Sequence, residues 1–449
     1  MYSLLKKFYK CNVLKLKHSK KGFAKNYVFS LLPTIFLKAI LCPLFLLLLV
    51  MSCKENPTDS GEPPKPPGYQ EDIPWPSLAN SPWPMNHHDP QSTGRCKYGG
   101  PKFGQISWQY DISGINSALA FTSFILGEDS TIYFGSSYEY DSLNQQQNSF
   151  LYAISLAGLV KWKFPLNYPY VSSSPIITSS NFILIGSGDN NLYAITLDGK
   201  LKWKYKANES IFLDGINIDK LGNIYVVIND GSLISLDKTG NLRWRLTTDG
   251  GFYSSSMTGI SISPNGETLY VTGNISKGSK SLYAISTEGN VIWKFGSNTY
   301  LNQPMVDSQG NIYINYNNKN DSLNYGFLSL SSAGVKRWVY NSVVGDIVPT
   351  IDKNGNIYFA GEKGIVSVDY NGNFRWEFSA NNLYPTSALL CDISGNIYYA
   401  SSDFVALNNN GTIKYVVEIN DVNYSTPAIG FDQVCLGSVN NPKIIYTIR

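Results

Sequence analysis

The most regular feature of this chain is a short run in which apolar and polar residues alternate. In residues 201–206, Leu201, Trp203 and Tyr205 fall on one side of an extended chain and three lysines fall on the other. Residues 242–246 and 374–378 alternate in the same way. A period of two residues is typical of a β-strand with one buried face. The pattern therefore predicts an all-β protein.

Each of these runs has an aromatic residue four positions after a glycine. The aromatic residues are Trp108, Trp162, Trp203, Trp244, Trp293, Trp338, Trp376 and Tyr415, and the glycines are Gly104, Gly158, Gly199, Gly240, Gly289, Gly334, Gly372 and Gly411. Glycine adopts the positive φ that a tight hairpin turn requires. Successive aromatic residues are 38 to 54 positions apart. This spacing indicates an internal repeat, and we interpret these residues as its structural core.

Each unit except the last contains four short predicted strands. The first is expected to include a proline in several copies (Pro175, Pro304, Pro349 and Pro427), and proline is tolerated at the edge of a sheet. Small sheets of this length, repeated without helices, are typical of a β-propeller. We therefore predict an eight-bladed β-propeller of four-stranded antiparallel blades over residues 85–449. The last unit has room for three strands, so residues 104–112 should supply its outer strand and close the ring.

The N-terminus has the pattern of a secretory leader. Residues 1–52 contain nine lysines and no acidic residue, and they end in the apolar run 39–51 followed by Ser52-Cys53. The order of basic, apolar and small residues predicts a signal peptide over residues 1–52. Residues 50–53 resemble the lipobox of bacterial lipoproteins, which implies a lipid on Cys53. An uncleaved anchor and a coincidental cysteine are the alternatives.

Residues 53–84 hold nine prolines, which favours polyproline II and predicts a semi-rigid tether between the lipid and the ring. Without the leader, the chain has 36 − 9 = 27 basic and 33 acidic residues. A mildly acidic domain is a poor ligand for nucleic acid, because binding to phosphates requires clustered lysine and arginine. Three cysteines remain beyond Cys53, namely Cys96, Cys391 and Cys435, and at least one must be unpaired within the chain.

Residues 171–206, from Ser172-Ser173-Ser174-Pro175 to Trp203-Lys204, resemble the repeat of pyrroloquinoline quinone (PQQ)-type propellers. Units at 117–164 and 253–295 match it as well. The resemblance implies two alternatives. Members include quinone-dependent dehydrogenases, which have adjacent cysteines, a carboxylate base and calcium ligands in the channel, and non-catalytic members include the propeller lipoprotein of the outer-membrane β-barrel assembly machine. No two cysteines are adjacent here. We therefore expect no enzyme activity, cofactor or metal.

Aromatic residues gather in the predicted loops at one face of the ring. The candidates for a binding site at the channel mouth are Tyr138, Tyr140, Tyr170, Phe212, Tyr253, Tyr300, Tyr384 and Tyr424. Two long loops, 136–148 and 315–325, belong to opposite blades and would make this mouth a cleft. Polar aromatic side chains suit a peptide or a sugar. The alternative is packing between blades with tolerated insertions.

Two other groups of residues have a structural and a functional interpretation. Asp219, Ser263, Asp307, Asp352 and Asp392 precede turns, where calcium binding is the alternative to turn formation. His87-His88-Asp89 could form an acid–base or metal site, or surface structure. We expect a monomeric lipoprotein of the bacterial envelope, anchored in the outer membrane, which binds a protein or glycan. Outer-membrane barrel assembly and quinone-dependent dehydrogenation are the alternative functions.

Overall fold

The computed structural model describes residues 64–449, except for 112–121, 142–144, 172, 249–250, 253–258, 274–281, 297–298, 319–324, 343, 420–424 and 438–443. The predicted signal peptide, Cys53 and most of the predicted tether lie outside these residues. Strands are the only regular elements in the described part of the chain. This part also contains no helix that is long and apolar enough to cross a membrane.

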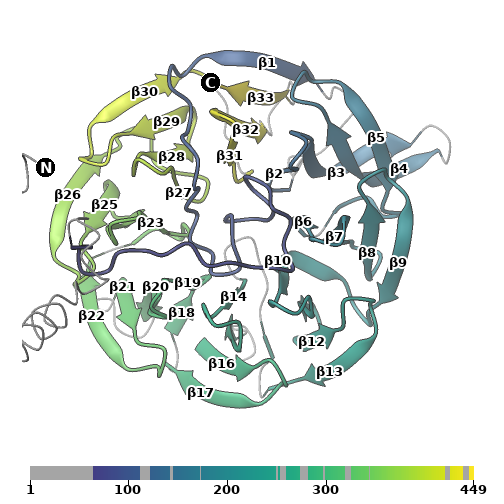
Figure 1. Ribbon diagram of the computed structural model, residues 1–449, viewed down its shortest axis with the longest axis horizontal. Coiled ribbons are helices and arrows are strands. Elements are labelled where there is room, and N and C mark those ends of the chain that lie inside the picture. Colours follow the sequence, from purple (N-terminus) through teal and green to yellow (C-terminus); the bar gives the residue numbers. More distant parts are fainter. Residues whose placement is uncertain are drawn as a thin grey trace, which may run out of the picture. The chain divides into compact units, whose positions relative to one another are not determined.

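The first four blades follow one another around the ring (Figure 1). In each, the strands run in chain order from the innermost to the outermost. Blade 1 consists of β2 (Ile125–Leu126), β3 (Ile132–Asp141), β4 (Gln146–Ile154) and β5 (Val160–Pro165), and blade 2 of β6 (Ile176–Ile177), β7 (Phe182–Gly186), β8 (Asn191–Thr196) and β9 (Leu201–Lys206). Blade 3 consists of β10 (Ile211–Ile218), β11 (Ile224–Ile228), β12 (Leu233–Leu236) and β13 (Leu242–Leu246), and blade 4 of β14 (Ile260–Ile262), β15 (Thr268–Thr272), β16 (Leu282–Ser286) and β17 (Val291–Phe295).

Blades 5 to 7 continue the ring, and blade 5 has an additional short strand because both β18 and β19 pair with β20. Blade 5 consists of β18 (Thr299–Leu301), β19 (Met305–Val306), β20 (Ile312–Asn318), β21 (Tyr325–Leu330) and β22 (Lys336–Asn341), and blade 6 of β23 (Thr350–Ile351), β24 (Ile357–Ala360), β25 (Gly364–Val368) and β26 (Phe374–Ser379). Blade 7 consists of β27 (Leu390–Cys391), β28 (Ile397–Ala400), β29 (Phe404–Leu407) and β30 (Ile413–Val417).

Blade 8 is built from both ends of the ring sequence, as predicted. Its inner strands are β31 (Ala428–Gly430), β32 (Gln433–Gly437) and β33 (Ile444–Ile448), and its outer strand is β1 (Ile106–Asp111). β1 pairs antiparallel with β33, and the backbones of Gln105 and Arg449 exchange two hydrogen bonds. The predicted eight-bladed, all-β architecture and its mode of closure are therefore confirmed.

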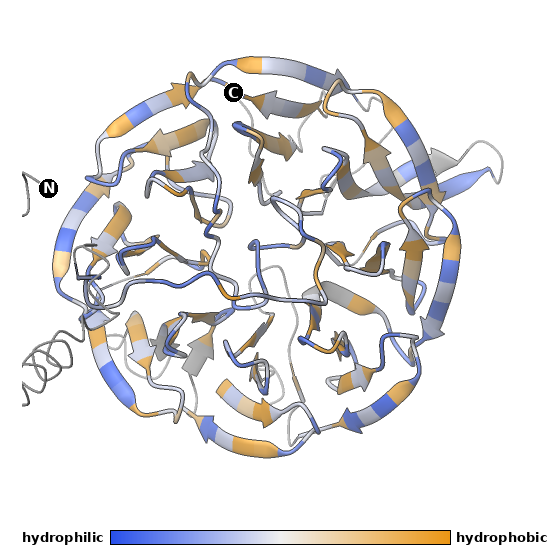
Figure 2. Ribbon diagram, viewed as in Figure 1, coloured by the Kyte–Doolittle hydropathy of each residue, from blue (hydrophilic) through white to orange (hydrophobic). Residues whose placement is uncertain are grey.

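The position of each strand in its blade follows from its pattern of hydrophobic residues. The second and third strands are buried along almost their whole length, as in β7 and β11. The outermost strands alternate, and Figure 2 shows this as bands around the circumference. The expected prolines directly precede the innermost strands rather than lying within them, at Pro175, Pro304, Pro349 and Pro427.

Neighbouring blades are joined through the repeated aromatic and glycine residues. Each outer-strand aromatic ring lies against the glycine of the next blade, and a Cβ atom at Gly411 would lie 2.7 Å from the ring of Trp376. Five of the indole N–H groups also donate to a carbonyl of that turn, as Trp376 does to Asn409 at 3.0 Å. Tyr415 covers Gly104 and donates to the carbonyl of Pro101 at 3.0 Å. The same contact therefore repeats across the closing blade.

Residues 65–81, which we call the cover segment, lie against the ring instead of leading away from it. The amide of Gln70 donates to the carbonyl of Lys353 at 2.8 Å, and the indole of Trp75 donates to that of Ile218 at 3.0 Å. Lys65–Arg449 forms one compact unit. This differs from the tether expected through Pro84, because the tryptophans and Leu78 between the prolines bury apolar surface against the blades.

Candidate functional site

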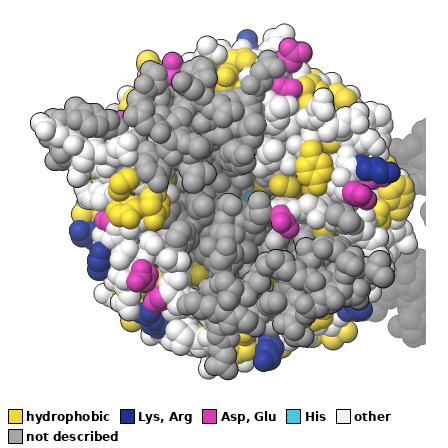
Figure 3. All heavy atoms as spheres, turned by 180° about the vertical axis from the view of Figure 1, so that it is seen from behind, with side chains coloured by type: hydrophobic (Ala, Val, Ile, Leu, Met, Phe, Trp, Pro, Cys, Tyr) yellow, Lys and Arg dark blue, Asp and Glu magenta, His cyan; other side chains and the backbone are white. Residues whose placement is uncertain are grey.

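The ring has two faces that differ in the connections they carry. We call the turn face the one with the turns that join first to second strands and third to outermost strands, and the cover segment crosses it (Figure 1). The loop face has the connections between blades and those between second and third strands. Figure 3 shows this loop face, on which the described hydrophobic side chains lie next to acidic and basic ones. The predicted aromatic site belongs to the loop face.

The structure describes the side chains of two of the eight aromatic candidates, Tyr170 and Tyr384. The rings of Tyr168 and Tyr170 meet edge to face, with centroids 4.8 Å apart. The hydroxyl of Tyr384 donates to the carbonyl of Gly361 at 2.8 Å, and its burial raises the pKa of this phenol. Tyr253, Tyr424 and the side chains of Tyr138, Tyr140, Phe212 and Tyr300 lie outside the described residues. Tyr384 thus packs on blade 6 and presents only part of its ring.

The two long loops predicted in blades 1 and 5 begin and end in extensions of strands, and residues 142–144 and 319–324 between them lie outside the described residues. β3 and β4 continue beyond a bulge between Ser136 and Glu139, and they pair out to Asp141 and Gln146, so that the hairpin projects from the ring (Figure 1). β20 and β21 pair out to Asn317 and Tyr325. The alternation of polar and apolar residues was too weak in these stretches to indicate strands. Both extensions lie on the loop face.

At the base of the blade 1 hairpin, a buried carboxylate joins two strands. Tyr152 donates to Glu139 at 2.5 Å, and Lys163 also binds Glu139. Burial, followed by the hydrogen bond to Glu139, raises the pKa of Tyr152. Because the lysine compensates the buried charge, this group fixes the hairpin in place.

The centre of the ring is occupied by residues 82–96, which we call the central segment. Its carbonyls accept hydrogen bonds from the last residue of the innermost strand in six blades: Trp83 from Leu126, Pro84 from Ile177, Pro90 from Ile262, Gln91 from Val306, Thr93 from Ile351 and Gly94 from Cys391. Asn217 of blade 3 donates to Pro90 at 3.1 Å, and the thiol of Cys96 contacts the carbonyl of Ile429 in blade 8 at 3.6 Å. One segment therefore contacts all eight inner edges.

The two adjacent histidines lie in this central segment in left-handed conformations, with φ of 55° at His87 and 74° at His88. His87 is buried, its Nε2 has no hydrogen-bond partner among the described residues, and burial lowers its pKa to about 4. His88 lies 3.2 Å from Asp89, whose carboxylate also accepts from the Thr93 amide at 3.0 Å. The histidines are thus packed components of the channel filling and not surface residues.

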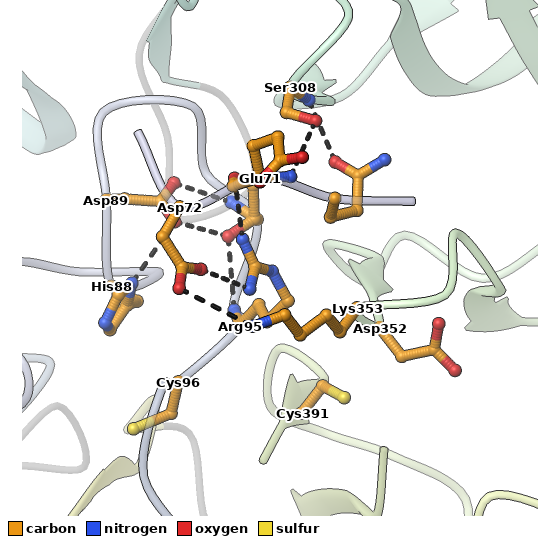
Figure 4. A network of polar contacts seen from close by, with 12 residues as sticks. Glu71, Asp72, His88, Asp89, Arg95, Cys96, Ser308, Asp352, Lys353 and Cys391 are labelled. Atoms are coloured by element: carbon orange, nitrogen blue, oxygen red, sulfur yellow. Dashed lines mark hydrogen bonds and ion pairs between the residues drawn. The ribbon is translucent and has the colours of Figure 1, made fainter. Parts of the chain in front are cut away.

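A cavity of about 650 Å³ lies between the cover segment and the central segment. Figure 4 shows the polar network on its wall, in which Arg95 donates to Asp72 at 2.6 Å and to the Glu71 carbonyl at 3.1 Å. The arginine holds the pKa of Asp72 below its usual value against the opposing effect of burial. Trp75 and several prolines supply the apolar part of the lining. No sequence pattern indicates this cavity, because the prolines of the cover segment predict a tether.

The aspartate carboxylates of the acidic turns accept hydrogen bonds from residues near them in the chain. Asp352 accepts from the amides of Asn354 and Asn356 at 2.9 Å, from the Asn356 side chain at 2.7 Å and from the Tyr358 hydroxyl at 2.8 Å. Asp219, Asp307 and Asp392 make the same set of bonds. Since these carboxylate oxygens already have donors, the turns are built for hydrogen bonding rather than for calcium.

The residues of the channel do not fit a quinone cofactor. Cys96 and Cys391 share a backbone hydrogen bond of 2.8 Å, but their sulfur atoms point apart in Figure 4, and the three described thiols are free and buried. The described residues contain no group of three or more His, Cys, Asp or Glu side chains that could hold a metal. The central segment also uses the inner edges that would surround a cofactor.

The fold and the repeat together define this chain as an eight-bladed propeller with PQQ-type repeats. The family model described as outer membrane protein assembly factor BamB matches residues 147–295, which confirms the resemblance seen in the sequence. A search of curated proteins finds no match.

Several solved structures share the fold. BamB from Moraxella catarrhalis aligns with a TM-score of 0.55 and 14% identity, over 77% of this chain and 97% of that chain. The quinohemoprotein alcohol dehydrogenase from Comamonas testosteroni aligns with a TM-score of 0.60 and 11% identity, over 82% of this chain and 80% of that chain. A europium-containing methanol dehydrogenase aligns with a TM-score of 0.58 and 12% identity, over 82% of this chain and 97% of that chain. At such identities the likeness establishes the fold alone.

Proposed function

We propose that this protein is a non-catalytic lipoprotein of the bacterial envelope, whose propeller binds a protein or glycan at its loop face. The observation that carries the proposal is the central segment. Its hydrogen bonds to the innermost strands use the part of a propeller where a channel ligand would bind. Recognition is then left to the surface, and the projecting hairpin of blade 1 enlarges the surface of the loop face.

A component of outer-membrane protein assembly is the most specific form of this proposal. Two observations favour it over other scaffolds. The matching family model is that of an outer membrane assembly factor, and the structural alignment spans nearly the whole of the Moraxella BamB chain. The partner would then be a protein of the outer-membrane assembly apparatus.

Co-purification from native membranes through a C-terminal tag, followed by mass spectrometry, tests this proposal. We expect an outer-membrane assembly protein in the eluate. Charge-reversal substitution of Lys363, which is exposed on the loop face between β24 and β25, should reduce its recovery, whereas Lys238→Glu on the turn face should not. Recovery of the tagged protein alone would contradict the assembly function. Equal losses with both variants would contradict the loop face as the binding surface.

The anchor is tested separately with Cys53→Ser. Loss of the thiol removes the atom that would receive the lipid, so the variant should leave the membrane fraction while the native protein stays in it. Stable membrane anchoring needs two lipid chains, or one chain and a second binding signal. Because the variant lacks the lipid, we expect nearly all of it to leave the membrane fraction. A variant that remains with the membrane would contradict the lipoprotein assignment.

A further inference from the structure

The large hydrophobic side chains that are exposed among the described residues gather on the turn face. Fifteen large hydrophobic residues are exposed in the described part of the chain. They lie in the turns of the turn face, at the adjoining ends of outer strands, or in residues 97–105 between the central segment and β1: Tyr98, Phe103, Ile106, Leu159, Val160, Leu201, Leu221, Leu242, Val291, Ile292, Val335, Phe374, Ile393, Ile413 and Phe431.

These residues form a ring because the blades repeat. In seven blades, the residue two positions after the turn glycine is an exposed apolar residue, such as Leu201, Leu242 and Phe374. Blade 5 has the exposed Val335 one position after its glycine instead. Apolar side chains scattered singly on a surface need no explanation, but a set that recurs beside the turn glycine of every blade indicates a contact surface.

The path of the chain identifies what this surface meets. The described chain begins at Pro64, and the next residues contact the turn face, where Gly68 packs on Tyr370. Ten residues, 54–63, separate Pro64 from Cys53. Since even a fully extended chain spans no more than about 3.6 Å per residue, this connection reaches roughly 40 Å at most. A lipid on Cys53 would therefore hold the turn face close to the bilayer.

We propose that the turn face is a membrane-contact surface that rests on the phospholipid bilayer. Its apolar ring enters the headgroup region, and exposed lysines such as Lys336, which follows Val335, extend their ammonium groups to the lipid phosphates. The loop face then points away from the membrane towards the partner. This inference rests on the proposed anchor at Cys53 and adds the orientation of the ring.

The test uses the lipidated protein in vesicles of phosphatidylethanolamine and phosphatidylglycerol. An environment-sensitive fluorophore is attached to Leu221→Cys on the turn face or, as the matched control, to Glu209→Cys on the loop face. Leu221 is 80% exposed and Glu209 is also exposed, so neither substitution disturbs the core. The native thiols Cys96, Cys391 and Cys435 are buried, and burial raises the pKa of Cys96 and Cys435 to about 12, so they should not react with the label.

Lipids brominated near the headgroup should quench the label at residue 221 several-fold more than the label at residue 209. Replacing Leu201, Leu242 and Phe374 with serine should reduce the quenching at 221, because the ring loses apolar contact. Equal quenching at both positions, stronger quenching at 209 or none at 221 would overturn the proposed orientation. Membrane fractionation of Cys53→Ser tests the lipid anchor independently of the quenching. If the native protein proves unacylated, an absence of quenching when vesicles are added also overturns the membrane-contact surface.

Discussion

The circumference of the ring and its centre are held together in different ways. Around the circumference, every blade contributes the same pair of residues, an aromatic ring and the glycine on which the preceding ring lies. At the centre, a single stretch of chain contacts the eight inner edges through residues that follow no repeat, and Pro90 serves two blades. A contact between repeated units can be inferred from their spacing. A contact made by one copy of a segment has no period and leaves no comparable pattern in the sequence.

The largest expected effect comes from removing the central segment and the closing strand β1 together. Deletion through Gly114 removes the central segment and β1, so blade 8 loses its outer strand and all inner edges lose their partners. We expect no cooperative thermal transition in circular dichroism. Deletion through Glu62 is the control, because it leaves both in place and should melt like the full chain. A melt of the longer deletion that matches this control would contradict the role of both segments.

The contribution of the central segment alone should appear as a dependence of the free energy of unfolding on pH. Burial lowers the pKa of His87 to about 4, against an ordinary value near 6.5, whereas Asp89 acts weakly in the opposite direction. The unfolded chain therefore binds this proton more readily than the folded chain. The contribution of His87 to the free energy of unfolding therefore has its full value above about pH 6.5 and declines as the pH falls towards 4.

Between about pH 7 and pH 5, the free energy of unfolding should fall by about 2 kcal/mol because of this residue. Urea denaturation at both values measures the change. His87→Asn retains a residue that tolerates a positive φ, and it should remove this part of the pH dependence. The same pH dependence in both proteins would show that His87 is not held neutral.

Two glycines with similar backbone conformations test the contact between blades at the circumference. We expect a smaller loss of stability from these substitutions. Gly411 and Gly310 have nearly the same φ, 84° and 85°, but only Gly411 lies under a ring, whereas the nearest atom to a Cβ at Gly310 would be 3.6 Å away. Alanine at Gly310 should cost about 1 kcal/mol for its backbone conformation. Alanine at Gly411 should cost about 1–2 kcal/mol more, because it displaces Trp376. Equal costs in urea denaturation would contradict blade joining by this contact.

The parts predicted correctly from the sequence are those in which a local pattern and the repeat agree. The alternation in residues 201–206 and the glycine four positions before each aromatic ring predict the strands, the blade count and the closure by β1. The hairpin in blade 1 was missed because a bulge between Ser136 and Glu139 breaks the alternation. The cover segment was interpreted as a tether because its prolines outnumber the few apolar residues, such as Trp75 and Leu78, that attach it to the blades.

The candidate site could be predicted only in outline. Tyr384 was expected at the loop face, but its use of Gly361 as a hydrogen-bond acceptor depends on how the connection between blades folds. The position of His87 in the channel depends on contacts with residues more than a hundred positions away, and a sequence pattern does not reveal such contacts. The cavity beside Arg95 likewise exists only where two non-repeated segments meet.

The split blade also has a consequence for how the protein is made. β1 is among the first strands of the chain and β33 is the last, so an exported chain that emerges from its N-terminus lacks the partner of β1 until its last residues arrive. Seven blades can form in order while the pairing edge of β1 stays open. Until then the protein is an open arc, and any factor that protects unpaired strands must act at β1.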